Sequence, residues 1–252
     1  MEGTKVLKST QIIILGICFA FATIFSTIIL SQAFMKVKKF SAEVIDVTGS
    51  AEKYLTSDKI VWTASFSRRA AQMVTTFKEL KNDLKEVMEY LKAKGIKEEE
   101  IVVSPVASSV LYKKDEKGND TNAIEAYVLS QGIEVESADV VRVAEVSRNS
   151  TELIERGIEF ISSAPQYFYT RLAELKLEML AEASRDARER AERIISAAGN
   201  KIGLMRSAKM GIFQITPANS YEISDWGMND TSSFEKKVTA VIHAEFAISE
   251  RN

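Results

Sequence analysis

The sequence predicts an α+β protein in which antiparallel sheets pack against long amphipathic helices, in the order β-β-α-β-β-α-β-α-β-β, preceded by one N-terminal transmembrane helix. Three observations lead to this prediction. Residues 12–30 form one uncharged apolar run. Several later segments place an apolar residue at every second position, which is typical of strands, and others place one at every third or fourth, which is typical of amphipathic helices. The 222 residues that follow the apolar run are enough for one large domain or two packed subdomains.

The apolar run is long enough to cross a bilayer. Its nineteen residues rise about 28 Å as a helix, close to the ~30 Å thickness of the hydrocarbon layer. We expect a cytoplasmic N-terminus at residues 1–11, a signal-anchor helix at 12–34 and an extracytoplasmic domain at 35–252, built as one domain or two subdomains. The expected lipid contacts are Ile12, Ile13, Ile14, Leu15, Phe19, Phe21, Ile24, Phe25, Ile28, Ile29 and Leu30.

A cleaved secretory signal is the alternative interpretation. A short basic start, an apolar run and Ser31-Gln32-Ala33 fit a signal peptide, and cleavage near Ala33 would release a secreted or periplasmic protein. The run exceeds the usual apolar region of about 7–15 residues, which favours the uncleaved anchor. Two lysines precede the run and three follow it, so lysine counts alone do not set the orientation. We base the cytoplasmic N-terminus on the uninterrupted first-helix layout.

The first soluble elements are predicted to be two strands and a helix. A strand lies within residues 40–54, and a second within 59–69, where Trp62 and Phe66 belong to an alternating apolar face. From residue 70 the apolar spacing changes to three and four, which predicts a helix that ends at Gly95.

A long hairpin and a second helix come next. Residues 101–112 and 127–135 are predicted strands on either side of a polar tip at 113–122, and Pro105 indicates an edge strand or a bulge. Asp139 is a candidate N-cap for a helix that stops at Gly157 and is interrupted near 148–150. Short β segments at 158–161 and 166–170 follow.

The last third of the chain contains the longest soluble helix, at 172–198, and two long strands at 202–215 and 235–249. Alanines in the apolar stripe of this helix, together with Ile194 near its end, predict close packing on a sheet. Residues 216–234 show no period, and structureless loops of that length are uncommon and often functional. We expect either a subunit-contact loop or a flexible excursion. The candidate oligomer contacts are Tyr221, Trp226, Met228 and Phe234.

Composition and motifs argue against several classes of function. The net charge is −2, from 33 basic and 35 acidic residues spread along the chain, so no footprint for nucleic acid is evident. Cys18, the only cysteine, lies in the apolar run, which excludes an internal disulfide and a cysteine zinc site. His243, the only histidine, lies on the polar face of a predicted strand, and no nucleophile motif accompanies it. We predict no catalytic residue, cofactor or metal site, and therefore no enzyme.

Several collinear strings resemble the SIMPL-domain family of exported and periplasmic proteins. They are residues 47–51, the helix end and strand at 91–101, the Tyr-x-x-Ser strand at 127–130, and, as the best match, 186–203. Ala51 and Ser57 depart from the pattern, because family members usually have Gly and Pro there. The resemblance spans about 41–248 and implies an α+β fold, ring or cage-like homo-oligomers and a link to envelope or oxidative-stress defence. It brings no catalytic residues.

These observations lead to one expected function and two rivals. We expect a membrane-anchored, non-enzymatic SIMPL-type protein whose partners are the lipid bilayer and further copies of itself, with contacts from sheet edges and the 216–234 loop. No nucleic acid partner is expected, and the sequence identifies no small-molecule ligand. The rivals are a monomeric envelope binding module and an uncharacterised envelope hydrolase built from carboxylates and hydroxyls. The hydrolase needs convergent acidic groups, which the sequence spacing does not supply.

Overall fold

The computed structural model describes residues 3–222 and 224–249, with the backbone alone described for residues 3–13 and 37–42. The chain is α+β, with antiparallel sheets, helices packed against them and a long apolar helix at the N-terminus, which confirms the predicted fold class. The described residues divide into two compact units. Unit 1 contains the residues up to Ser50, Ala181–Gly211 and those from Val241 onward, and unit 2 contains Ala51–Leu180 and Ile212–Ala240.

The N-terminal helix α1 runs over Gly3–Ala42 and continues past both ends of the predicted 12–34 segment. Within it Ile14–Lys36 has a mean hydropathy of 2.3, and none of its most apolar window is buried. In the described part of the chain it is the one helix long and apolar enough to cross a membrane or to act as a signal sequence. The predicted lipid contacts from Ile14 to Leu30 are all exposed, while the side chains of Ile12 and Ile13 lie outside the described residues.

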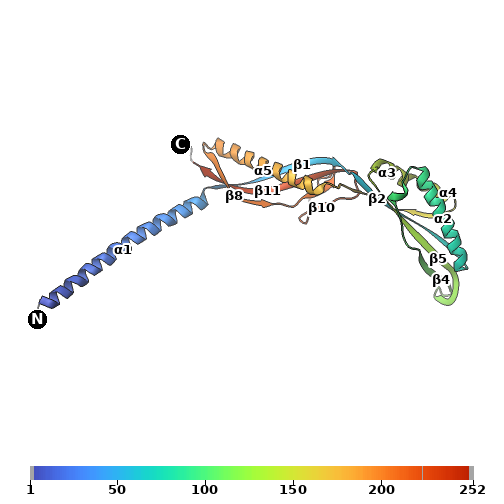
Figure 1. The fold of residues 1–252 in the computed structure, drawn as a ribbon, viewed down its shortest axis with the longest axis horizontal. Coiled ribbons are helices and arrows are strands. Elements are labelled where there is room, and N and C mark those ends of the chain that lie inside the picture. The colour runs from blue at the N-terminus through green and yellow to red at the C-terminus, as the bar shows by residue number, and fades with distance from the viewer. Residues whose placement is uncertain (1–2, 223, 250–252) are drawn as a thin grey trace. The chain divides into compact units, whose positions relative to one another are not determined.

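Unit 2 is built on a six-stranded sheet of order β3-β5-β2-β6, in which β4 also pairs with β5 and β7 with β2 (Figure 1). All of these pairs are antiparallel. The strands are β2 (Lys59–Ala70), β3 (Ile101–Val103), β4 (Ala107–Lys114), β5 (Asp120–Ser137), β6 (Glu159–Ser162) and β7 (Gln166–Phe168). The helices are α2 (Met73–Ala93), the 3-10 turn η1 (Glu98–Glu100), α3 (Val140–Asn149) and α4 (Glu152–Glu155).

The core of unit 2 forms where apolar faces of the sheet and helices meet. Trp62 and Phe66 are fully buried, as their alternation along β2 predicts, and Val87 and Leu91 of α2 belong to the same cluster. The indole Nε1 of Trp62 donates a hydrogen bond to the Ser162 hydroxyl over 3.0 Å, so this large side chain is buried with its polar atom satisfied.

Unit 1 shows close packing between a helix and a sheet. Helix α5 (Leu172–Ala197), β1 (Val44–Thr56) and β11 (Glu235–Ser249) each contribute residues to both units, and within unit 1 α5 packs closely on β1 at Gly49. Within unit 1, Ala183, Ala187 and Ala191 of α5 are fully buried, which confirms the predicted alanine contact. Strand β8 (Lys201–Met210) pairs antiparallel with the last part of β11.

Two predicted strands are divided in the structure. The 202–215 segment becomes β8 and β9 (Gln214–Pro217), separated at Gly211, whose N–H donates to the Val241 carbonyl over 2.8 Å. The 101–112 segment becomes β3 and β4, separated around Pro105, which has no N–H to offer a ladder. In unit 2, β9 pairs antiparallel with the first part of β11 and parallel with the short β10 (Met228–Asn229), which lies in the predicted loop.

Candidate functional site

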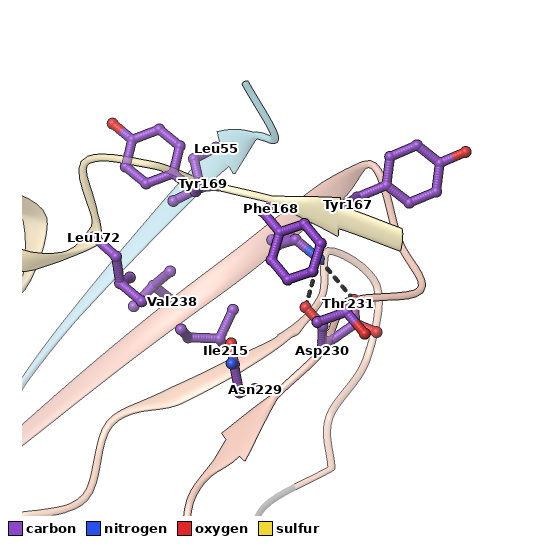
Figure 2. Close-up of a pocket in the computed structure, with 11 residues that line it drawn as sticks. Leu55, Tyr167, Phe168, Tyr169, Leu172, Ile215, Asn229, Asp230, Thr231 and Val238 are labelled. Carbon is purple, nitrogen blue, oxygen red and sulfur yellow. Dashed lines mark hydrogen bonds and ion pairs between the residues drawn. The ribbon is translucent and has the colours of Figure 1, made fainter. Parts of the chain in front are cut away.

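Unit 2 contains a small cavity of about 70 Å³ next to a buried ion pair (Figure 2). Its lining comes from segments far apart in the sequence: the end of β1, the residues around β7, the start of α5, β9, and the chain from β10 into β11. These residues are Leu55, Tyr167, Phe168, Tyr169, Leu172, Ile215, Asn229, Asp230, Thr231, Lys236 and Val238. Figure 2 shows the Tyr167 and Tyr169 hydroxyls pointing in different directions.

Strand register and loop hydrogen bonds position this lining. Lys236 and Val238 share one face of β11 because side chains alternate along a strand, and Val238 lies opposite Ile215 of β9. The chain after β7 is fixed by the Asp58 carboxylate, which accepts hydrogen bonds from the Thr170 N–H and hydroxyl over 2.7 and 2.8 Å. The residues around the cavity are therefore tied to the sheets at several points.

Lys236 is the most unusual residue of the site, because only 2% of its surface is exposed. Its ammonium donates to the Asp230 carbonyl oxygen over 2.6 Å and lies 3.3 Å from the Asp230 Oδ2. The Asp230 carboxylate also accepts from the Ser232 N–H and hydroxyl, over 2.9 and 2.7 Å, and from the Ser233 N–H over 3.2 Å. The buried charges are therefore compensated locally, as buried ions must be.

The surroundings shift the pKa values of both partners. Burial disfavours the charged Asp230, but hydrogen bonds from Ser232 and Ser233 and the charge of Lys236 outweigh it and lower the pKa of Asp230 to about 2. Burial also lowers the pKa of Lys236, and the nearby Asp230 carboxylate partly offsets that effect. Asp230 is therefore ionised across the physiological pH range.

The chemistry available to this cavity is limited. Most of its surface is hydrocarbon, and the Lys236 ammonium is already engaged by Asp230. Among the described residues, no three His, Cys, Asp or Glu side chains gather to hold a metal ion. His243 belongs to unit 1, where its Nδ1 lies 3.0 Å from the Thr48 hydroxyl. We interpret the Asp230–Lys236 pair as a structural ion pair that stabilises the chain between β10 and β11.

The four predicted contact residues lie in different environments of unit 2. Tyr221 and Trp226 are 90% and 95% exposed, whereas Met228 is half-buried in β10. Phe234 packs against Tyr167, with ring centroids 6.1 Å apart. The structure therefore presents two large aromatic side chains to solvent and places the other two closer to the body of the unit.

A second surface feature was not predicted from the sequence. It is an apolar groove of about 200 Å³, which we call the α3 groove, lined by Val140, Val141, Ala144, Arg148, Tyr167 and Phe234. A signal for it was present: Val140 and Val141 are adjacent on an amphipathic helix, so both cannot face the core. Val140 is buried, and Val141 is 67% exposed.

The fold and the N-terminal helix together define an α+β protein that has, among the described residues, one helix of the signal or anchor type. The sequence model of the SIMPL family, described as "Protein of unknown function (DUF541)", matches residues 45–246, and the chain belongs to this family. This match confirms the resemblance found in the sequence. A comparison with curated proteins finds no match.

Proposed function

We propose that this SIMPL protein is a membrane-anchored, non-enzymatic component of the cell envelope that self-assembles outside the cytoplasm into a ring or cage-like homo-oligomer. The exposure of Trp226 and Tyr221 is the observation that carries the proposal. A role in envelope or oxidative-stress defence rests on the family resemblance alone. Two features of the site argue against an enzyme. The cavity is mainly apolar, and the Lys236 ammonium is already bonded to Asp230.

The exposed aromatics provide a strong driving force for association. Aromatic side chains bury about 150–250 Å² each, which at about 25 cal/mol per Å² corresponds to roughly 4–6 kcal/mol before the costs of association. Tyrosine and tryptophan are also enriched among the residues that dominate interface energies. A second copy that covers Trp226 and Tyr221 would remove this surface from water.

Two sheet edges support further contacts between copies. Every residue of β4 is exposed, and β8 leaves Leu204, Met205 and Met210 exposed. Strand edges present unpaired backbone groups that another chain can extend. These edges can therefore supply contacts between copies in addition to those of the aromatic side chains.

For the membrane arrangement we propose a cytoplasmic segment at 1–11, a spanning helix at 12–34 and an external domain at 35–252, in preference to cleavage near Ala33. The exposed apolar surface of Ile14–Lys36 supports this arrangement. Only Glu43 separates α1 from β1, and the six helical residues after Lys36 rise about 9 Å. The first strand would therefore begin close to the lipid headgroups.

Protease digestion of cells made permeable only at the outer surface tests this arrangement. We expect loss of the 35–252 domain while a membrane-embedded N-terminal fragment remains, because the domain faces outward. A domain that stays protected would reverse the orientation. A soluble mature chain that begins near Phe34 would establish cleavage instead.

Replacing Trp226 with alanine is expected to weaken self-association by about 30-fold or more, as for an interface residue worth 2 kcal/mol. The measurement is the native mass of the full chain, extracted from membranes, across a dilution series. Tyr54→Ala is the matched control, since Tyr54 is an exposed aromatic of unit 2 outside the loop. A wild-type chain that stays single-copy at every concentration refutes self-assembly, and capture of an envelope component by that single copy would support the binding module instead.

A further inference from the structure

We infer that the Trp226 turn of one copy, defined as Ser224–Gly227, inserts into the α3 groove of the next copy. This inference rests on the proposed self-assembly and names the two surfaces that meet. The turn and the groove both belong to unit 2, so each copy carries one of each.

The backbone of the Trp226 turn is held by hydrogen bonds. The turn is closed by a hydrogen bond from the Gly227 N–H to the Ser224 carbonyl over 3.1 Å, and the same carbonyl accepts from the Gln214 side chain over 2.6 Å. Gly227 has a φ of +87°, a conformation that glycine adopts at little cost. Because the turn is already ordered, little chain entropy is lost when Trp226 enters a partner.

The α3 groove offers what an indole ring needs. Its lining is mainly apolar and includes exposed Val141 and the Tyr167 and Phe234 rings, which pack against each other. Its one cation is Arg148, which has no hydrogen-bond or ion-pair partner in the described part of the chain. A guanidinium over an indole face contributes about 0.5–2 kcal/mol, depending on how far it is desolvated.

Charge complementarity selects a second copy as the occupant. Asp225, next to Trp226, is exposed and likewise has no partner among the described residues. The turn thus combines an aromatic ring with an anion, and the groove combines an apolar floor with a cation. Complementary charges favour this register over others.

The contact is heterologous, because one surface of a copy meets a different surface of its neighbour. Such contacts generate rings when the rotation between neighbours closes, and open filaments when it does not. One indole buries about 150–250 Å², whereas a standard interface buries about 1,200–2,000 Å². Trp226 is therefore the anchor of the contact, with Tyr221 and the exposed strand edges supplying the remaining area.

A charge exchange in the full chain tests this pairing. Asp225→Arg and Arg148→Asp should each weaken self-association by about tenfold or more, because each places like charges together. The double variant should self-associate more tightly than either single variant, because the opposite charges meet again in exchanged positions. It should stay weaker than wild type, because no guanidinium then faces the indole from position 148. Native mass across a dilution series measures all four proteins. If the singles match wild type, or if the double is as weak as the singles, the pairing is wrong.

Cross-linking between copies provides an independent readout. In a Cys18→Ser background, copies carrying Asp225→Cys are mixed with copies carrying Arg148→Cys under a mild oxidant. We expect a disulfide between the two kinds of copy, and none when the second copy carries Leu177→Cys, an exposed site on α5 in the same unit. Oligomeric wild type without this cross-link overturns the pairing and leaves self-assembly standing on another surface. Single-copy wild type refutes both.

Discussion

Replacing Gly49 with alanine is expected to lower the free energy of unfolding by about 3 kcal/mol, at the upper end of what overpacking costs. In unit 1, a Cβ at position 49 would lie 2.2 Å from the Ala183 carbonyl oxygen and 2.5 Å from the Ala187 nitrogen. Both are backbone atoms of α5, so no side-chain rotation relieves the conflict. The helix or the strand has to move, and the buried contacts of the alanine stripe weaken with it.

Thermal unfolding of the full chain in detergent measures this effect. At about 2–4 °C per kcal/mol for a domain of this size, Tm should fall by roughly 6–12 °C. Asp46→Ala, at an exposed position of the same strand, should leave Tm nearly unchanged. Adding Ala187→Gly to Gly49→Ala should not restore stability, because the Ala183 carbonyl remains in place. A Gly49→Ala protein that melts with the wild type would refute the close approach.

The fold elements were predictable where burial follows a local period. The alternation through Trp62 and the alanine stripe of α5 both identify buried faces correctly. The last turn of that stripe was predicted incorrectly. Ile194 is mostly exposed and Ile195 is buried, because the stripe continues from Ala191 by a step of four residues and not three.

Contacts between distant segments could not be predicted from local patterns. The periodicity of α2 places Asp83 on the solvated face, yet the side chain is buried and forms a bidentate pair with Arg68, at 2.5 and 2.8 Å. The other charged side chains on that face of α2 are exposed. Asp83 is the exception because the fold brings Arg68 of β2 next to it, which the sequence of α2 does not show.

The loop illustrates the same limit. Its missing period marked 216–234 as unusual, but its shape depends on hydrogen bonds to remote backbone groups. Examples are the Ser57 N–H to the Phe234 carbonyl and the Tyr167 N–H to the Thr231 carbonyl, over 2.9 and 2.7 Å. The cavity and the α3 groove both bring together residues from distant segments, so they depend on such contacts.

Replacing Asp230 with alanine is expected to destabilise the protein by about 3–5 kcal/mol, the cost of leaving one partner of a buried ion pair uncompensated. Lys236 would keep its buried position but lose the carboxylate beside it. Chemical denaturation of the full chain at neutral pH measures the change. Asp120→Ala is the matched control, since that carboxylate of unit 2 is exposed and should shift stability by less than about 0.5 kcal/mol.

The contribution of Asp230 should also depend on pH in a defined direction. Its pKa is about 2 in the folded chain and 3.8 as the ordinary value, so the folded state favours the ionised carboxylate. The resulting stability, about 2 kcal/mol, is present above pH 4 and is lost as the pH falls from about 4 to 2. The difference in stability between wild type and Asp230→Ala should shrink over that interval. A constant difference would mean that the carboxylate is not held in its ionised form.

The double variant Asp230→Ala/Lys236→Met separates the cost of an orphaned charge from the value of the ion pair. Buried ion pairs replaced by apolar groups of similar volume are often neutral or even stabilising, because the desolvation cost of both ions disappears. Lys236 lies in a mainly hydrocarbon cavity, so methionine should pack there and recover most of the loss at neutral pH. The double variant could instead be as unstable as Asp230→Ala alone. In that case the chain between β10 and β11 is stabilised by the hydrogen bonds that Asp230 accepts from Ser232 and Ser233, and not by its pairing with Lys236.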